Sequence, residues 1–383
     1  MKRTVKFDFD APIDRAGTWS TRWDRYARRD VIPLWVADTD FRPPPAVLEA
    51  LAARVTHGVL GYTTAPEELR EAIVERLQRL YRWRIEPDWI VFLPGVVPGL
   101  HHAARILTEP GDHIVVPKPV YQHLTRAAEL APRAHSSFPL VLERGRWVFD
   151  TGALKKSISP KSRLLFLCNP QNPGGTVFTR EELLQVAELA RGLVIVSDEI
   201  HSDLVLDANR SHVPIASLAP EISRRTVTLM SPNKSFNFPA AGCAWAIIED
   251  AAMRRAYAAD LDAHALPSPS VFGYAAALAA YREGGAWLAA QIDYLRANRD
   301  LVERTAATWP AVSMAHVEAT YLAWIDCSRL GVKDPHRFFL ERGVGLSPGS
   351  QFGDGNFVRL NFGTQRSILE TALSRMTQAV QAA

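Results

Sequence analysis

The stretch RTVTLMSPNKSFNFPAAGCAWAIIE, residues 225–249, places two apolar runs on either side of one central charge, Lys234. A buried ammonium without a partner is costly, and it tends to lose its proton through a lowered pKa. A lysine in such a setting is therefore either an exposed loop residue or a functional one. The rest of the chain indicates which of the two applies.

Six apolar runs of strand length occur in the chain, and two of them lie within this stretch. They are WIVFLPG (89–95), HIVVP (113–117), RLLFLCN (163–169), LVIVSD (193–198), TVTLMS (226–231) and CAWAII (243–248). Runs without polar alternation are typical of strands that helices cover on both faces. Helical patterns intervene, most clearly TREELLQVAELAR (179–191), in which Thr179 and Glu182 predict a capping box. This order predicts an α/β domain with a mainly parallel sheet.

The pattern changes at about residue 281. A long helical stretch is followed there by short strands, a short helix, the strand FVRLNFG (357–363) and a closing helix. We therefore expect a large domain over residues 46–280. Residues 1–45 and 281–383 are expected to form a small α+β domain.

The composition argues against several classes of partner. The 44 basic and 41 acidic side chains leave a net charge of +3, which is too even to indicate nucleic acid or a membrane surface. Asp8 and Asp10 interrupt the apolar run that a signal peptide needs, and no run is long enough to span a membrane. Cys168, Cys243 and Cys327 lack zinc-site spacing and are typical of reduced, buried cysteines in a cytoplasmic protein.

Polar turns rich in glycine or proline follow five of the predicted strands. They are PGVVPG (94–99), PVYQH (119–123), NPQNPGG (169–175), SDEIH (197–201) and SPNK (231–234). Ligands of open α/β sheets bind beyond the carboxyl ends of the strands. We therefore expect these turns to meet at one edge of the sheet, with Lys234 among them.

Nucleotide and metal chemistry are not supported. A P-loop needs glycine directly before the lysine and again five residues earlier, where this chain has Asn233 and Thr228. No G-x-G-x-x-G follows the first predicted strand, which argues against a dinucleotide site. SDEIHSD offers Asp198, His201 and Asp203, but their spacing matches no known metal motif, so no metal site is expected.

Pyridoxal 5′-phosphate (PLP) chemistry fits the remaining pattern. PLP needs a lysine for attachment, an acidic partner for its pyridine nitrogen and an anion site for its phosphate. The chain carries, in order, LWVADTDF (34–41), GVLGYT (58–63), CNPQNPGG (168–175), SDEIHSDL (197–204), SPNKSFN (231–237), TYLAWID (320–326) and LSPGSQFG with FVRLNFG (346–363). In these motifs it resembles the fold-type I PLP enzymes, the aspartate aminotransferase superfamily. Within them it is most similar to the MalY/PatB group of carbon–sulfur lyases, often called cystathionine β-lyases.

The resemblance covers essentially the whole chain and implies both a fold and a cofactor site. The large domain would contain the seven-stranded sheet of fold type I. Lys234 would form a Schiff base with PLP and carry protons, Asp198 would hold the pyridine nitrogen protonated, and Tyr121 would stack on the ring. The other implied cofactor ligands are Asn172 and His201 at the ring, and Val96, Val97, Ser231 and the partner subunit's Tyr62 at the phosphate.

The same resemblance implies a substrate site at the interface of a homodimer. Arg359 would bind the carboxylate of a small amino acid, because a guanidinium grips a carboxylate with two charge-assisted hydrogen bonds. Asn172, Tyr62 and the backbone of Val36 would complete this site.

The implied reaction is α,β-elimination from L-cystathionine or another cysteine S-conjugate, which gives a thiol, pyruvate and ammonia. Two features favour the lyase group: His201 replaces the tyrosine usual in aminotransferases, and GCAWA lacks their phosphate-binding arginine. An aminotransferase shares every step up to the carbanion, so transamination remains an alternative.

Three positions depart from the pattern of the lyase group. Thr39 replaces a methionine, Gln171 replaces a histidine, and QHL follows Tyr121 where Pro-Phe is common. We expect all three around the substrate pocket, so a larger S-conjugated cysteine with a diverted outcome is a further alternative. A non-catalytic regulator also stays open, although the 45 residues before the large domain are too few for a DNA-binding helical domain.

Overall fold

The computed structural model describes residues 7–383, so the first six residues of the predicted N-terminal arm lie outside the described part. Its main sheet has eight strands in the order β2-β9-β8-β7-β6-β3-β4-β5. They are β2 (Ile90–Leu93), β3 (His113–Lys118), β4 (Ala134–Glu143), β5 (Arg146–Phe149), β6 (Ser162–Cys168), β7 (Val194–Asp198), β8 (Thr226–Met230) and β9 (Ala244–Ile248). The strands from β8 through β7, β6 and β3 to β4 are parallel, whereas β2, β9 and β5 join antiparallel.

All six predicted strands are present, and the hairpin of β4 and β5 adds two more, so the sheet has eight strands, one more than the expected seven. Sequence reasoning missed this hairpin because β4 (AHSSFPLVLE) is half exposed and rich in polar residues. Arg144 and Gly145 both have positive φ, 51° and 79°, in the two-residue turn between the strands. Such a turn matches the twist of the paired strands.

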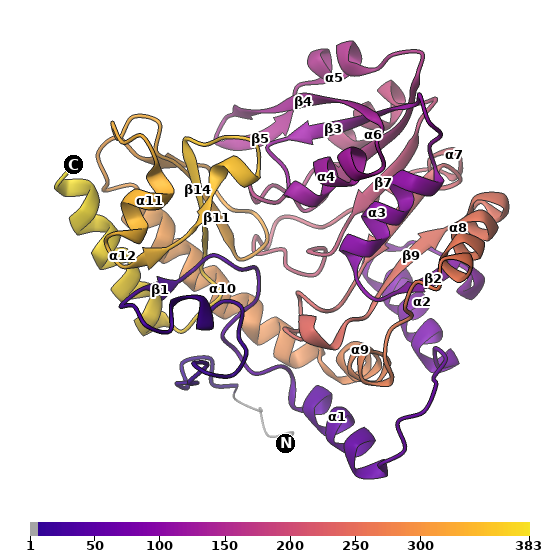
Figure 1. The fold of residues 1–383 in the computed structure, drawn as a ribbon, viewed down its shortest axis with the longest axis horizontal. Helices are drawn as coiled ribbons and strands as arrows, with labels where there is room; N and C mark the ends of the chain where they lie inside the picture. The colour runs from indigo at the N-terminus through magenta and orange to yellow at the C-terminus, as the bar shows by residue number, and fades with distance from the viewer. Residues whose placement is uncertain (1–6) are drawn as a thin grey trace.

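Helices cover both faces of this sheet (Figure 1). They are α2 (Glu67–Tyr81), α3 (Val96–Ile106), α4 (Gln122–Leu130), α5 (Thr151–Ser157), α6 (Arg180–Leu189), α7 (Pro220–Ser223), α8 (Ala251–Ala263) and α9 (Val271–Glu283). In β3, Ile114 and Val116 pack into the core beneath α3 and α4, whereas Val115 packs on the opposite face beneath α5 and α6. Burial on both faces explains the apolar runs without alternation. The predicted capping box at the start of α6 is confirmed.

The C-terminal part forms a second core with the N-terminal segment. Its antiparallel sheet has the order β10 (Ser313–Met314), β11 (Leu322–Asp326), β14 (Phe357–Asn361) and β13 (Ser347–Pro348). The helices α10 (Gly285–Ala306), α11 (Pro335–Leu340) and α12 (Arg366–Gln381) supply apolar side chains to the same core.

The N-terminal segment returns to this part of the molecule. The short strand β1 (Ile32–Pro33) pairs in parallel with β12 (Val344–Gly345), and Figure 1 shows the indigo N-terminal segment beside the yellow C-terminal elements. The helix α1 (Pro45–His57) then packs against α9. Among residues 7–383, no helix is both long and apolar enough to cross a membrane.

Candidate active site

A cavity of about 360 Å³ opens where the parallel strands of the main sheet end. The predicted turns contribute to its lining Pro94, Gly95, Val96, Val97, Pro98, Tyr121, Gln122, Asn172, Asp198, Ile200, His201, Asn233 and Lys234. All five turns therefore meet at one edge, as predicted. The opposite wall comes from the N-terminal strap Trp35–Ala37 and from Ser347, Gln351, Phe352 and Arg359.

Lys234 lies in the turn after β8, and its Nζ donates a hydrogen bond to the carbonyl oxygen of Ala37. The side chain is only partly exposed because it faces the enclosed cavity. Burial lowers the pKa of its ammonium group to about 8; Asp38 and Asp198 oppose this shift, while Arg359 adds to it. A neutral amine is therefore accessible near neutral pH, as a proton carrier requires.

Asp198 ends β7 and is buried, with the N–H of Ile200 donating to its Oδ1 at 3.1 Å. Burial raises the pKa of this carboxyl group to about 7; the N–H of Ile200 lowers it and nearby Glu199 raises it. A buried carboxyl group with so little compensating charge can accept a cationic ring nitrogen. This environment fits the pyridine nitrogen of PLP.

His201 follows three residues later and is also buried. Burial lowers the pKa of its imidazole to about 3, and the charges of Lys234 and Arg359 act in the same direction. Its Nδ1 has no hydrogen-bond partner in the described chain. A neutral imidazole with a free nitrogen fits the phenolic oxygen of PLP.

The start of α3 borders one end of the cavity. The first N–H groups of a helix lack intrahelical acceptors, and together with the macrodipole they favour an anion. Val96 and Val97 open this 11-residue helix and line the cavity. Ser231 instead directs its hydroxyl to the carbonyl oxygen of Cys243 at 2.6 Å and accepts from the N–H of Asn233 at 3.1 Å. Its contact with a phosphate thus stays a prediction.

Arg359 reaches the cavity from β14. Its guanidinium donates to Asn172 Oδ1 at 3.0 Å, to the carbonyl oxygen of Trp35 at 2.9 Å and to Ser347 Oγ at 3.3 Å. Burial lowers its pKa to about 10, so it remains charged at neutral pH. Within residues 7–383 no carboxylate pairs with this arginine, and its Nε has no partner. The carboxylate of a ligand would supply the missing countercharge.

The structure gathers most predicted site residues but not all of them. The cavity brings together Lys234, Asp198, His201, Asn172, Tyr121, Val96, Val97, Val36 and Arg359. Ser231 lies behind the wall, and Tyr62 is fully exposed on the segment between α1 and α2.

Several lining residues were missed at the sequence level. They are Trp35, Ala37, Cys168, Ser347, Gln351 and Phe352. Most belong to LWVADTDF and LSPGSQFG, so the motifs that carry the resemblance were the available signal. Cys168, expected to be a simple buried residue, pairs with Asp198 across β6 and β7 and lines the cavity.

Two of the three departures from the lyase pattern do not line the cavity themselves, although Gln171 precedes the lining residue Asn172 and Thr39 follows the lining residue Ala37 by two positions. Gln171 directs its Nε2 to the carbonyl oxygen of Pro119 at 2.7 Å and accepts from the N–H of Gly174, which braces its own turn. Thr39 is buried, with its N–H bonded to Asn237 at 3.0 Å. Gln122, from the QHL segment, is the departure that does line the cavity.

Comparison with known proteins agrees with this geometry. Residues 29–376 match the family described as aminotransferase class I and II. The chain is 38% identical to cystathionine beta-lyase PatB of Bacillus subtilis (strain 168), over 97% of this chain and 100% of that protein. It is 34% identical to Protein MalY of Escherichia coli (strain K12), over 98% of this chain and 99% of that protein.

Solved structures show the same similarity. OvoB matches with a TM-score of 0.96 and 45% identity, over 98% of this chain and 100% of that one. Cystalysin from Treponema denticola, whose structure contains PLP, matches with a TM-score of 0.94 and 29% identity, over 99% of this chain and 100% of that one. The chain therefore belongs to the aminotransferase class I and II family of fold-type I enzymes, with PLP as its cofactor.

Proposed function

We propose that this protein is a PLP-dependent carbon–sulfur β-lyase that cleaves L-cystathionine or another cysteine S-conjugate into a thiol, pyruvate and ammonia. The observation that carries the proposal is one cavity containing a buried amine of lowered pKa, Lys234, a buried carboxyl group, Asp198, and a guanidinium without a countercharge, Arg359. The name of the Bacillus subtilis relative, cystathionine beta-lyase PatB, supports the same activity.

The residues of the chain divide the work between binding and proton transfer. Bound PLP supplies an electron sink for the pair of electrons left on the α-carbon of the substrate. Arg359, with Asn172 beside it, holds the substrate carboxylate and so orients the α-carbon. The neutral amine of Lys234 accepts the α-proton, and its ammonium form can return a proton to the departing thiolate. Asp198 supplies the negative charge opposite the ring nitrogen.

Transamination is the second candidate, because the family includes relatives such as the aspartate aminotransferase of Geobacillus stearothermophilus, 26% identical to this chain. It would use the same residues up to removal of the α-proton. Within the described chain, Arg359 is the one arginine that lines the cavity. This one cation can bind the α-carboxylate of the substrate in either reaction, so the lining does not separate them, and the names of relatives such as cystathionine beta-lyase PatB favour elimination.

Incubation of the purified protein with PLP and L-cystathionine separates these reactions. Release of thiol and pyruvate without an added keto acid is expected of the lyase. Amino transfer that depends on a keto acid, with no pyruvate, would assign the protein to the transaminases. A protein that gains no visible absorbance after PLP addition would support the regulatory alternative.

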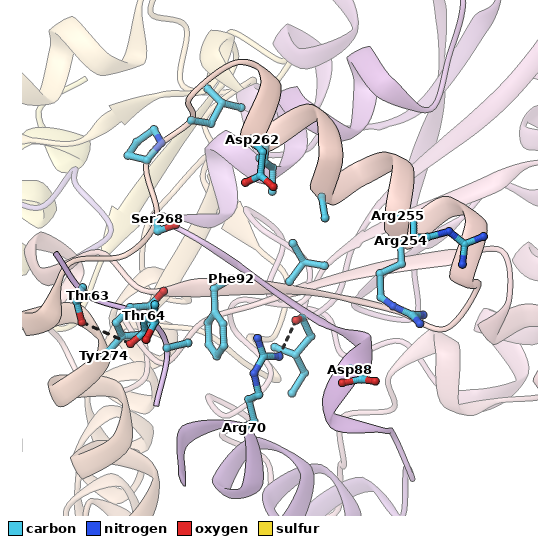
Figure 2. Close-up of a pocket in the computed structure, with 17 residues that line it drawn as sticks. Thr63, Thr64, Arg70, Asp88, Phe92, Arg254, Arg255, Asp262, Ser268 and Tyr274 are labelled. Carbon is cyan, nitrogen blue, oxygen red and sulfur yellow. Dashed lines mark hydrogen bonds between the residues drawn. The ribbon is translucent and has the colours of Figure 1, made fainter. Parts of the chain in front are cut away.

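We also propose a homodimer in which Tyr62 reaches the active site of the partner subunit. Tyr62, Val59 and Leu60 are all largely exposed on one extended segment. Thr63 and Thr64, next along this segment, line a cavity of about 480 Å³ together with residues of β2, α8 and the loop after α8 (Figure 2). Neighbouring exposed apolar side chains indicate a surface that a second protein covers.

Hybrid dimers test this arrangement. Lys234→Ala and Tyr62→Ala subunits should each be weakly active alone. Mixing them should restore activity, because one site of the hybrid then combines an intact Lys234 with an intact Tyr62 from the other subunit. Light scattering checks the mass, and a monomer at assay concentration would contradict the proposal.

A cytoplasmic location is part of the same proposal. The three cysteines are free and buried, as is usual in a reducing compartment. Fractionation of the source cells, with detection by antibody, would check the location.

A further inference from the structure

The motif TYLAWID (320–326) supplies no residue to the cavity lining, yet Tyr321 lies directly behind one wall. Its side chain is fully buried, and its hydroxyl donates to the carbonyl oxygen of Ala37 at 3.0 Å. The same carbonyl oxygen accepts the hydrogen bond from Lys234 Nζ. One cavity-lining carbonyl therefore contacts both the amine of the active site and a buried phenol.

The backbone just before Tyr321 is strained. Thr320 has a φ of 75°, in the left-handed region that β-branched residues rarely adopt. Its N–H donates to Leu204 O at 2.8 Å, and its Oγ1 accepts from the N–H of Leu322 at 3.1 Å. Strain of this kind persists where the surroundings over-determine it, and it clusters at functional sites. Here it lies next to the residue that contacts Ala37.

We propose that Tyr321 is a positioning residue that fixes the carbonyl of Ala37 as the resting place of the Lys234 amine whenever that amine is not attached to PLP. The inference rests on the proposed role of Lys234. A carbonyl oxygen has two lone pairs. The hydroxyl of Tyr321 occupies one of these lone pairs whether or not Lys234 is attached to PLP, and the other lone pair is left for the amine of Lys234.

The hydroxyl matters most when Lys234 is attached to the cofactor. Without the hydroxyl of Tyr321, the carbonyl of Ala37 would then have neither of its two side-chain donors, which is unfavourable for an acceptor at the wall of the cavity. The strap would be free to shift, although Arg359 holds the carbonyl of Trp35 and Asn361 holds that of Val36. The released amine would then meet a displaced acceptor and transfer its proton from a poorer position.

The test is Tyr321→Phe, which removes the hydroxyl and keeps the ring that packs edge-on against His201 at 5.8 Å. We expect kcat for cystathionine to fall roughly 10-fold while KM changes little, since misplacement affects the transfer step. The isotope effect measured with α-deuterated cystathionine should rise, because proton transfer then limits the rate more strongly.

A second readout needs no turnover. The apoprotein takes up PLP through the neutral amine, so the rate of uptake, followed by absorbance, has a pH midpoint. In Tyr321→Phe this midpoint should move to higher pH, because Lys234 becomes the single donor to Ala37 and its charged form is favoured. The groups that face Lys234 from the surrounding elements are unchanged by the variant, namely Asp38, Tyr121, Asp198, His201 and Arg359.

Tyr257→Phe is the matched control. Tyr257 is equally buried, its hydroxyl donates to Gly99 O at the same 3.0 Å, and it does not line the cavity. Both variants should lose a similar amount of thermal stability, and Tyr321→Phe alone should change the isotope effect and the uptake profile. Identical behaviour of the two variants in both readouts would overturn the inference. Failure of the proposed function would look different, since the native protein would then release no pyruvate from cystathionine.

Discussion

The two sides of the active-site cavity are assembled in different ways. On the cofactor side, Asp198 is the last residue of β7, and Val96 and Lys234 lie just beyond the ends of β2 and β8, which belong to the same sheet. On the substrate side, Arg359 binds the carbonyl of Trp35, a residue 324 positions earlier in the chain. The cofactor side follows from the order of the strands in the sheet. The substrate side depends on contacts between the C-terminal part of the chain and its N-terminal segment.

The ionisable groups on the two sides of the cavity also differ in their pKa values relative to neutral pH. Burial moves the pKa of Asp198 to about 7 and that of Lys234 to about 8, so both groups can exchange protons near neutral pH. Burial also lowers the pKa of Arg359, but only to about 10, so its guanidinium stays charged at neutral pH. The cofactor side therefore holds one proton carrier, Lys234, and one carboxyl group, Asp198, whose negative charge a cationic ring nitrogen would stabilise, and the substrate side holds a permanent positive charge.

Replacement of Lys234 should have the largest effect, because it removes both the attachment point and the proton carrier. We expect Lys234→Ala to lower activity by roughly 1000-fold or more and to abolish the visible absorbance of bound PLP after dialysis. Lys155→Ala, an exposed change on α5, is the control. Absorbance that survives in Lys234→Ala would show that PLP is attached to another lysine. The assignment of Lys234 to the cofactor side would then be wrong.

Replacement of Arg359 should come next and should spare the cofactor. Arg359→Ala removes a two-pronged contact with a carboxylate worth about 3 kcal/mol, so kcat/KM should fall roughly 100-fold while the absorbance of PLP persists. Arg359→Lys keeps the charge without the planar geometry and should recover only part of the loss. The exposed Arg337→Ala serves as control. Loss of PLP binding in Arg359→Ala would show that the two sides are not separable.

The stability of the PLP-free protein should depend on pH through the cofactor side. Lys234 has a folded pKa of about 8 against an ordinary value of 10.5, so the unfolded chain binds more protons between these values. Its contribution to stability is present above 10.5 and is lost as the pH falls through 8. Urea unfolding near pH 8 and pH 10 should therefore show a rise of about 2 kcal/mol, which Lys234→Met should flatten.

Asp198 should act with the opposite sign. Its folded pKa of about 7 lies above the ordinary value of 3.8, so its contribution is present below 3.8 and is lost as the pH rises through 7. Asp198→Asn should remove this loss and raise the free energy of unfolding at neutral pH. An unchanged pH profile in that variant would mean that the carboxyl group is less enclosed than the structure indicates.

Replacement of Ser231 should have the smallest effect. Ser231→Ala removes the hydrogen bond to Cys243, so we expect a loss of about 1 kcal/mol in stability and little change in PLP affinity. Thr226→Val removes a comparable buried hydroxyl contact, with Ile222 O at 2.7 Å, and is the control. A tenfold weaker affinity for PLP in Ser231→Ala would show that the hydroxyl turns to the phosphate, as the resemblance implies.

The sequence by itself determined the cofactor side of the cavity. The carboxyl ends of the adjacent parallel strands β3, β6, β7 and β8 face one edge of the sheet, so the four turns that follow them meet there. The fifth turn follows β2, which runs in the same direction but is separated from β8 by the antiparallel strand β9. Sequence order did not decide where each side chain points. Gln171 braces its own turn, and Ser231 bonds to Cys243, because rotamers depend on the groups packed around them.

Only the tertiary structure decided the substrate side. Ala37, Tyr321 and Arg359 belong to three distant segments, and no periodicity within any one of them indicates that they meet. Their contacts follow from the return of the N-terminal segment, through the pairing of β1 with β12, to the core that contains β11 and β14. The predicted boundaries between the large and the small domain, at residues 45/46 and 280/281, remain a prediction. Local patterns report which face of an element is buried, but not which distant element covers it.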